Sequence, residues 1–146
     1  MAEKKTNIPQ ITIAEVLKLD HEKSVELPSS FQEALQAVVE EYAVVILTTN
    51  NKIIRIIPTS SNKVYKLAVD IGQLSSDFLR QIGNLFLKLG LKALYSTGIC
   101  FVEEKCVFDG YIEATEFKKI NIEDLKKELS SIEGVSGITI TVLEVC

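Results

Sequence analysis

The sequence of 146 residues has few of the residue types that build catalytic and metal sites. It contains one histidine, His21, and three cysteines, none of them in a CxxC spacing: Cys100, Cys106 and Cys146. Zinc sites need clustered Cys and His, so we expect no metal site. A Ser-His-Asp triad would have to use His21, which lies in a polar stretch typical of a solvated turn. No glycine-rich phosphate loop is present either. We therefore expect a protein that is not an enzyme and carries no cofactor.

Long hydrophobic runs and an excess of positive charge are also absent. The longest apolar run, 43–47, is far below the roughly 20 residues that span a bilayer, and residues 1–5 lack the apolar stretch of a signal peptide. Sixteen Lys+Arg against twenty Asp+Glu give a net charge of −4, which excludes a protein that coats nucleic acid nonspecifically. We expect no membrane association and a reducing, cytoplasmic location.

The cysteine pattern favours two ordinary strand residues at Cys100 and Cys106. Both flank a predicted hairpin, however, so some strand registers could pair them in a disulfide.

What the sequence does contain is 47% hydrophobic residues, enough for a core without covalent staples. One proline and four small polar residues at 58–62 indicate a linker. We expect two domains, at 8–58 and 63–146.

The first domain has a mostly β pattern. We expect strands at 11–19 and 25–28, a helix that Ser29 or Ser30 caps and that runs through Val38, and a hairpin of 42–48 and 52–57. Asn50-Asn51 is suited to positive φ in the hairpin turn.

The second domain has the order βαββαβ, which is typical of a ferredoxin-like sheet with both helices on one face. Ser75 or Ser76 should cap the first helix, which stops at Gly90, and Asn121 should cap the second, which ends at Gly134. The expected strands are 64–69, 91–101, 106–115 and 138–145.

Two segments of this domain could bind a small ligand. The loop Asp70-Ile71-Gly72-Gln73-Leu74 leads into a helix N-terminus, where free N–H groups attract a carboxylate, and Gly72 allows close approach to the backbone. Ser96 and Thr97 place hydroxyls in an apolar strand. The alternatives remain open: an ordinary turn for the loop, and a β-bulge or close strand approach for the hydroxyl pair.

Four lysines are the candidates for DNA contact. Lys18 and Lys23 could meet phosphates from a projecting loop, with Lys4 and Lys5 as an arm. Plain solubilising lysines are the alternative.

Residues 16–20, the segment Val25-Glu26-Leu27-Pro28 with the helix after it, and the hairpin ending at Pro58 together resemble the AbrB/MazE family. This resemblance implies a swapped-hairpin module that forms interleaved dimers, and DNA binding through the loop before the Val-x-Leu-Pro motif. Lys23-Ser24 stands where that family usually has Gly-Arg.

The second domain resembles an ACT domain through its element order, Asp70-Ile71-Gly72-Gln73-Leu74 and Gly90-Leu91-Lys92. This resemblance implies side-by-side pairing of sheets and an amino acid bound at the interface.

The expected fold class is therefore α+β: a small, mostly β swapped-hairpin module followed by a ferredoxin-like βαββαβ domain. We expect a ligand-responsive transcriptional regulator that forms a homodimer or a dimer of dimers. The alternative is an oligomeric regulatory or protein-interaction module that does not bind DNA.

Overall fold

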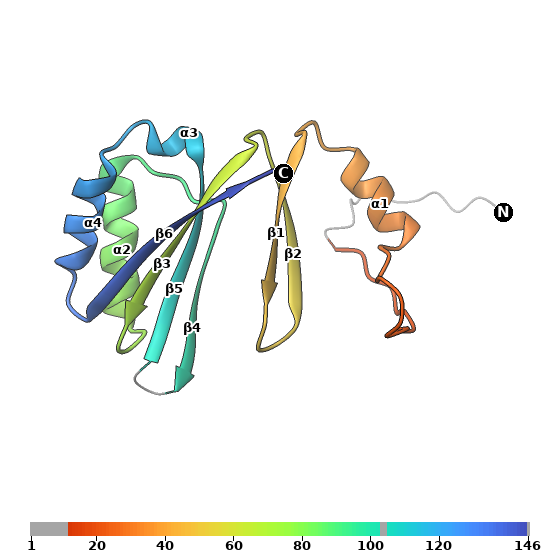
Figure 1. Ribbon diagram of the computed structural model, residues 1–146, viewed down its shortest axis with the longest axis horizontal. Coiled ribbons are helices and arrows are strands. Elements are labelled where there is room, and N and C mark those ends of the chain that lie inside the picture. The colour runs from red at the N-terminus through yellow and green to blue at the C-terminus, as the bar shows by residue number, and fades with distance from the viewer. Residues whose placement is uncertain (1–11, 103–104, 146) are drawn as a thin grey trace, which may run out of the picture. The chain divides into compact units, whose positions relative to one another are not determined.

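The structure is a computed structural model that describes residues 12–102 and 105–145. The described residues form an α+β fold with two antiparallel sheets and four helices (Figure 1). In chain order the elements are α1 (Ser29–Gln36), β1 (Tyr42–Thr48), β2 (Ile53–Thr59), β3 (Lys63–Ile71), α2 (Ser76–Leu89), β4 (Tyr95–Val102), β5 (Lys105–Glu113), α3 (Ala114–Phe117), α4 (Ile122–Ser130) and β6 (Val135–Glu144).

The described chain divides into two compact units, Met1–Val39 and Glu40–Cys146. The hairpin β1–β2 thus packs with the four-stranded sheet, whereas the sequence analysis grouped it with the N-terminal residues. Whether 8–58 and 63–146 act as separate domains stays a prediction.

The first unit contains a helix but no strand among residues 12–39. The expected strands at 11–19 and 25–28 are therefore wrong for every residue described, since Ile11 lies outside the described range. A strand needs a neighbour that pairs its N–H and C=O groups, and the first unit supplies none. The predicted helix is confirmed as α1, but it ends at Gln36, before Val38. The expected cap at Ser29 or Ser30 is wrong, because both serines lie within the helix and the N-cap position is Pro28, which supplies no side-chain hydrogen bond.

The hairpin is confirmed, with β1 and β2 in antiparallel register from Tyr42↔Thr59 to Thr48↔Ile53. Five of the seven residues of β1 are β-branched or aromatic, which favours an extended strand. In the turn, Lys52 adopts positive φ (60°), so the expectation that Asn50-Asn51 would do so is wrong. The side chain of Lys52 donates to the carbonyl oxygen of Thr49 at 2.7 Å.

The four-stranded sheet has the order β4-β5-β3-β6, with every neighbouring pair antiparallel. The predicted helix ends are confirmed: Ser75 accepts from the N–H of Phe78, Gly90 closes α2 with φ 67°, and Asn121 accepts from the first amides of α4. Gly134 does not end α4 itself but turns the chain into β6, with φ 92°.

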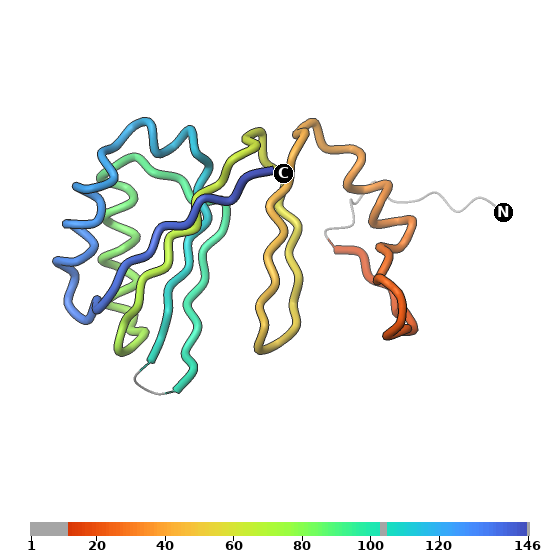
Figure 2. The backbone as a smooth tube through the Cα atoms, in the orientation of Figure 1, coloured from red at the N-terminus to blue at the C-terminus, as the bar shows by residue number. Residues whose placement is uncertain are grey.

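One face of this sheet is covered by α2 and α4, which lie on the same side of it (Figures 1 and 2). Lys88 on α2 and Glu128 on α4 form an ion pair at 3.3 Å, so the two helices are neighbours. The main core lies between helices and sheet. Its fully buried members are Leu67, Val69, Ile112, Leu125 and Leu129.

The second face of the sheet carries the hairpin. Val44 and Ile46 of β1 pack on Val64 and Tyr111 in a second, smaller core. Thr59, 2% exposed, donates from its hydroxyl to Oε1 of Glu113 at 2.6 Å. The inner side of the hairpin is thereby held against the start of β3 and the end of β5.

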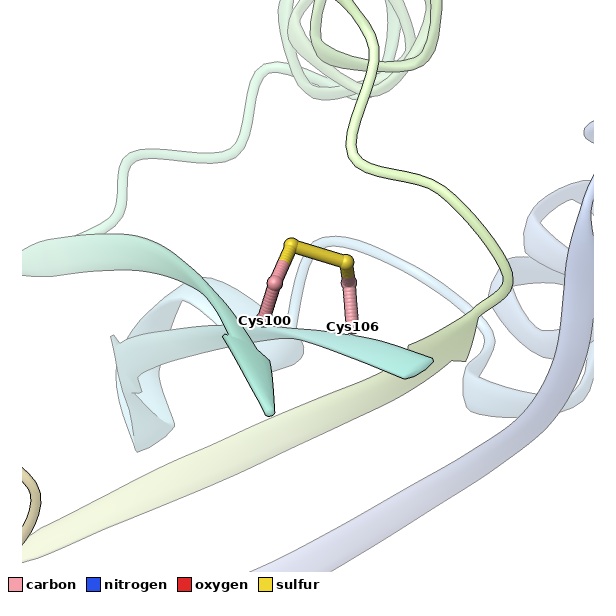
Figure 3. Close-up of a disulfide and its surroundings, with 2 residues drawn as sticks. All are labelled: Cys100 and Cys106. Atoms are coloured by element: carbon pink, nitrogen blue, oxygen red, sulfur yellow. A yellow bond between two sulfur atoms is a disulfide. The ribbon is translucent and has the colours of Figure 1, made fainter. Parts of the chain in front are cut away.

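Cys100 and Cys106 form a disulfide, with an S–S distance of 2.03 Å (Figure 3). Two unpaired strand cysteines were the favoured expectation, and that expectation is wrong. The register of β4 and β5 places the two residues directly opposite each other, with Cα atoms 3.9 Å apart. Cys146 lies outside the described residues.

None of the helices described is both long enough and apolar enough to cross a membrane.

Candidate functional site

The predicted effector loop follows β3 directly, but its amides are partly used within the protein. The N–H of Gly72 donates to the carbonyl oxygen of Gly134 at 3.3 Å, and the Ser75 cap takes the N–H of Phe78. Leu74 turns inward and packs against Gly98 of β4. The loop is therefore tied down at both ends, and the Gly72 amide is engaged by the chain itself.

Two of the predicted residues, Asp70 and Thr97, lie on the second face of the sheet. In the register, Thr97 stands opposite Asp109, and Asp109 stands opposite Ala68. Residues two apart on a strand share a face, so Asp70 joins Ala68 there. The sheet thus gathers these side chains around Asp109.

Asp109 is the least expected residue of this group, because it is a carboxylate on a sheet strand with a side chain only 19% exposed. Its Oδ2 lies 3.9 Å from Nζ of Lys66. Its Oδ1 is buried and has no hydrogen-bond partner among the residues that the structure describes. We call Lys66, Asp70, Thr97 and Asp109 the Asp109 cluster.

Burial raises the pKa of the Asp109 carboxyl above its ordinary value of 3.8, Lys66 opposes this, and Asp70 adds to it. Burial also raises the pKa of the neighbouring Tyr111 phenol, with a further contribution from the Asp109 charge. A raised carboxyl pKa next to an unpaired oxygen marks a site where a cationic or hydrogen-donating group would be stabilised.

Sequence reasoning missed Lys66 and Asp109. The available signal was a charged residue in the middle of each of two mostly apolar strands, whose other charged residues lie toward the strand ends. A charge at such a position is unusual enough to examine, but only the register shows that the two meet.

The remaining predicted ligand residues are not brought into this cluster. Ser96 is exposed and alternates to the opposite face from Thr97, and Gln73 is exposed on the loop. The six residues of the two segments predicted to bind a ligand therefore do not converge on one point.

The predicted DNA contacts Lys18 and Lys23 line one open hollow formed by residues 17–26. Three carboxylates line the same hollow: Asp20, Glu22 and Glu26. Two lysines against three carboxylates give the lining of this hollow a net charge of −1. DNA contact by Lys18 and Lys23 stays a prediction. Lys4 and Lys5 lie outside the described residues.

The hairpin has a second side, which faces away from its core. Strand alternation places six residues there, opposite Val44 and Ile46, and none is charged or polar; Val45, Leu47 and Ile54 among them are 63%, 52% and 61% exposed. We call this set the outer face of the hairpin: Ala43, Val45, Leu47, Ile54, Ile56 and Pro58.

Within 12–102 and 105–145, no group of three or more His, Cys, Asp or Glu side chains could hold a metal ion.

Comparison with known proteins finds no family model and no curated protein that matches the chain.

Proposed function

We propose that this protein is a self-associating regulator that responds to a small-molecule effector, with an amino acid as the effector class. The observation that carries the proposal is the Asp109 cluster, where a largely buried carboxylate keeps one oxygen without a partner among the described residues. Burying a polar atom unpaired costs about 1–3 kcal/mol. Because this oxygen has almost no accessible surface, a ligand that donates to it and recovers that cost would bind with a local opening of the groups that cover Asp109.

The charges of the cluster are complementary to a zwitterion. Asp109 and Asp70 offer acceptors for an ammonium group, and Lys66 offers a cation for a carboxylate. Thr97, opposite Asp109, adds a hydroxyl that can donate or accept. A free amino acid presents both of these charged groups close together.

The strand order supports a ferredoxin-like, ACT-like arrangement for the effector domain. β4-β5-β3-β6 is the order that a βαββαβ chain takes in a ferredoxin-like sheet, and α2 and α4 pack on one face of it. This supports an effector role through resemblance, while the residues of the cluster supply the chemistry.

Self-association is supported by two uncovered apolar surfaces. The outer face of the hairpin is apolar throughout, as a swapped-hairpin module requires. No residue of 12–39 is buried, although Val16, Val25 and Val39 are apolar and more than 60% exposed. Exposed apolar side chains that lie together are typical of an interaction site.

The effector proposal is tested by a thermal-shift screen against the twenty amino acids, since a ligand that binds only the folded protein raises its Tm. We expect one amino acid, or one chemical class, to stabilise the protein, and Asp109→Asn to abolish that shift. Asp124→Asn, an exposed carboxylate on α4, is the matched control and should keep it. A panel without any shift, or a shift that survives in Asp109→Asn, contradicts the proposal.

The oligomeric state is tested by light scattering. We expect a dimer or a dimer of dimers, and a lower mass for Leu47→Asp, which places a charge on the outer face of the hairpin. Glu41→Asp, which changes an exposed residue next to the hairpin without altering its charge, should leave the mass unchanged.

The carboxylates around Lys18 and Lys23 favour a second candidate, a regulator that acts on a protein partner and not on DNA. Binding to mixed DNA at low salt discriminates the two. A salt-dependent affinity that falls in Lys18→Ala/Lys23→Ala supports DNA binding, and no binding at low salt supports the protein partner.

A further inference from the structure

Arg55 is a charged residue on the inner side of the hairpin. It lies in β2 directly opposite Ile46, whose side chain belongs to the small core between hairpin and sheet. The inner positions on either side of it along β2 are Ile53 and Ile57. An arginine at such a position is half-buried among apolar neighbours, so its charge needs compensation.

The structure compensates the positive charge of Arg55 only in part. The guanidinium lies 4.8 Å from the ring centroid of Tyr95 on β4, within cation–π range. Its Nη1 is 3.5 Å from Oγ1 of Thr48, a long contact. No carboxylate lies within ion-pair distance of it in the described part of the chain. A guanidinium has five N–H donors, so most of its hydrogen-bonding capacity is available.

A cavity of about 280 Å³ opens at this guanidinium, between the tip of the hairpin and β4. Its polar lining comes from both elements: Thr48, Asn50, Asn51 and Arg55 from the hairpin, and Tyr95 and Thr97 from β4. Oδ1 of Asn51 accepts from the N–H of Ile53 at 3.2 Å, which leaves its amide N–H donors for another partner. The cavity is lined by donors and one full positive charge, and no acidic residue contributes to its wall.

We propose that this cavity binds the carboxylate group of a small-molecule ligand, with Arg55 as its counter-ion. The planar fork of a guanidinium matches a carboxylate in a bidentate pair. One positive charge balances one carboxylate group, and the second carboxylate of a dicarboxylate such as succinate would stay in solvent. A phosphate dianion instead concentrates two charges on one group, which calls for more cations than this wall provides. The volume suits a ligand the size of a small organic acid.

This site shares Thr97 with the Asp109 cluster, but its charged group is Arg55 and it does not depend on the proposed effector. Asp109 and Lys66 do not line the cavity. Thr97 lines it and stands opposite Asp109 in the register, so the two sites are neighbours on the second face of the sheet.

The chain has two arginines, Arg55 and Arg80, which permits a direct test by NMR. In ¹⁵N-labelled protein each gives one side-chain Nε–Hε signal, and Arg80 pairs with Asp77 on the exposed surface of α2. We expect titration with succinate to shift the Arg55 signal saturably, with a Kd of about 1 mM or below, and to leave the Arg80 signal in place. Neutral succinamide should move neither.

Two variants complete the test. Arg55→Gln should weaken succinate binding about 10- to 100-fold, measured from backbone signals of Thr97 and Ile99. Arg80→Gln is the matched control and should bind as the wild type does. Asp109→Asn should leave the response of the Arg55 signal unchanged.

Four results would overturn the proposal. The first is an Arg55 signal that stays in place throughout the succinate titration, and the second is an equal shift of both arginine signals. The third is binding of succinamide or inorganic phosphate as tight as the binding of succinate. The fourth is a loss of the Arg55 response in Asp109→Asn, which would show that the cavity and the Asp109 cluster form one binding site.

Discussion

Reduction of the Cys100–Cys106 disulfide is the perturbation whose cost follows most directly from the chain. The bond closes the β4–β5 hairpin over a sequence separation of 6. Cross-linking so short a loop removes about 8 cal/mol/K of entropy from the unfolded chain, which stabilises the folded state by about 2 kcal/mol at 25 °C. For a unit of this size, that corresponds to a fall in Tm of about 8 °C on reduction.

Urea unfolding with and without a thiol reductant measures this cost. We expect the reduced wild type to lose about 2 kcal/mol of unfolding free energy, and the double variant Cys100→Ala/Cys106→Ala to be unaffected by the reductant. Thiol titration of the native oxidised protein should find Cys100 and Cys106 unreactive. A wild type with equal stability in both conditions, after mass spectrometry has shown the bond to be present, would refute the reasoning.

Three further outcomes are expected. Gly98→Ala should destabilise the protein by about 1–3 kcal/mol in urea unfolding, because a Cβ there would lie 2.7 Å from a methyl group of Leu74. Its control Gly83→Ala, with nothing within 4 Å, should stabilise α2 by about 0.5–1 kcal/mol; equal effects would contradict this. Ser75→Ala should lower stability by about 1 kcal/mol through loss of the cap, and an unchanged midpoint would show that the cap contributes nothing. The raised pKa of Asp109 means that the folded state binds more protons than the unfolded state above pH 3.8, so its contribution to stability falls as pH rises through this window. In Asp109→Asn, this fall of the unfolding free energy with rising pH should disappear. An unchanged slope of unfolding free energy against pH would show that another group causes the fall.

The elements that could be predicted from the sequence are those whose causes are local. Ser75 and Asn121 cap helices through their own side chains, and Gly90 ends α2 because it adopts positive φ without steric cost. The β-branched run of β1 likewise favours a strand in its own right.

The elements that could not be predicted depend on distant partners. Apolar residues between 12 and 28 alternate as strands do, yet alternation does not supply a neighbour for the backbone to pair with. The disulfide depended on a register that could shift by one residue and place Cys100 and Cys106 out of reach.

The candidate site shows the same limit at the level of side chains. The loop at Gly72 could be predicted to have free amides, but the carbonyl of Gly134 takes the Gly72 amide from a distant part of the chain. The sequence shows Asp109 as a charge at the centre of a mostly apolar strand, but the burial that leaves its oxygen unpaired comes only from the folded sheet.

The placement of Tyr111 gives the proposed regulator a physical link between effector and hairpin. Tyr111 belongs to the small core that holds Val44 and Ile46, and it follows Asp109 by two residues on the same face of β5. A ligand can shift association only if it binds the associated and free forms with different affinity. A ligand on Asp109 would alter the charge beside the Tyr111 phenol, whose pKa already responds to that carboxylate. The hairpin turns its inner side to Tyr111 and its apolar outer face away from this core. A change in how the inner side packs would therefore reach the surface through which the protein is proposed to associate.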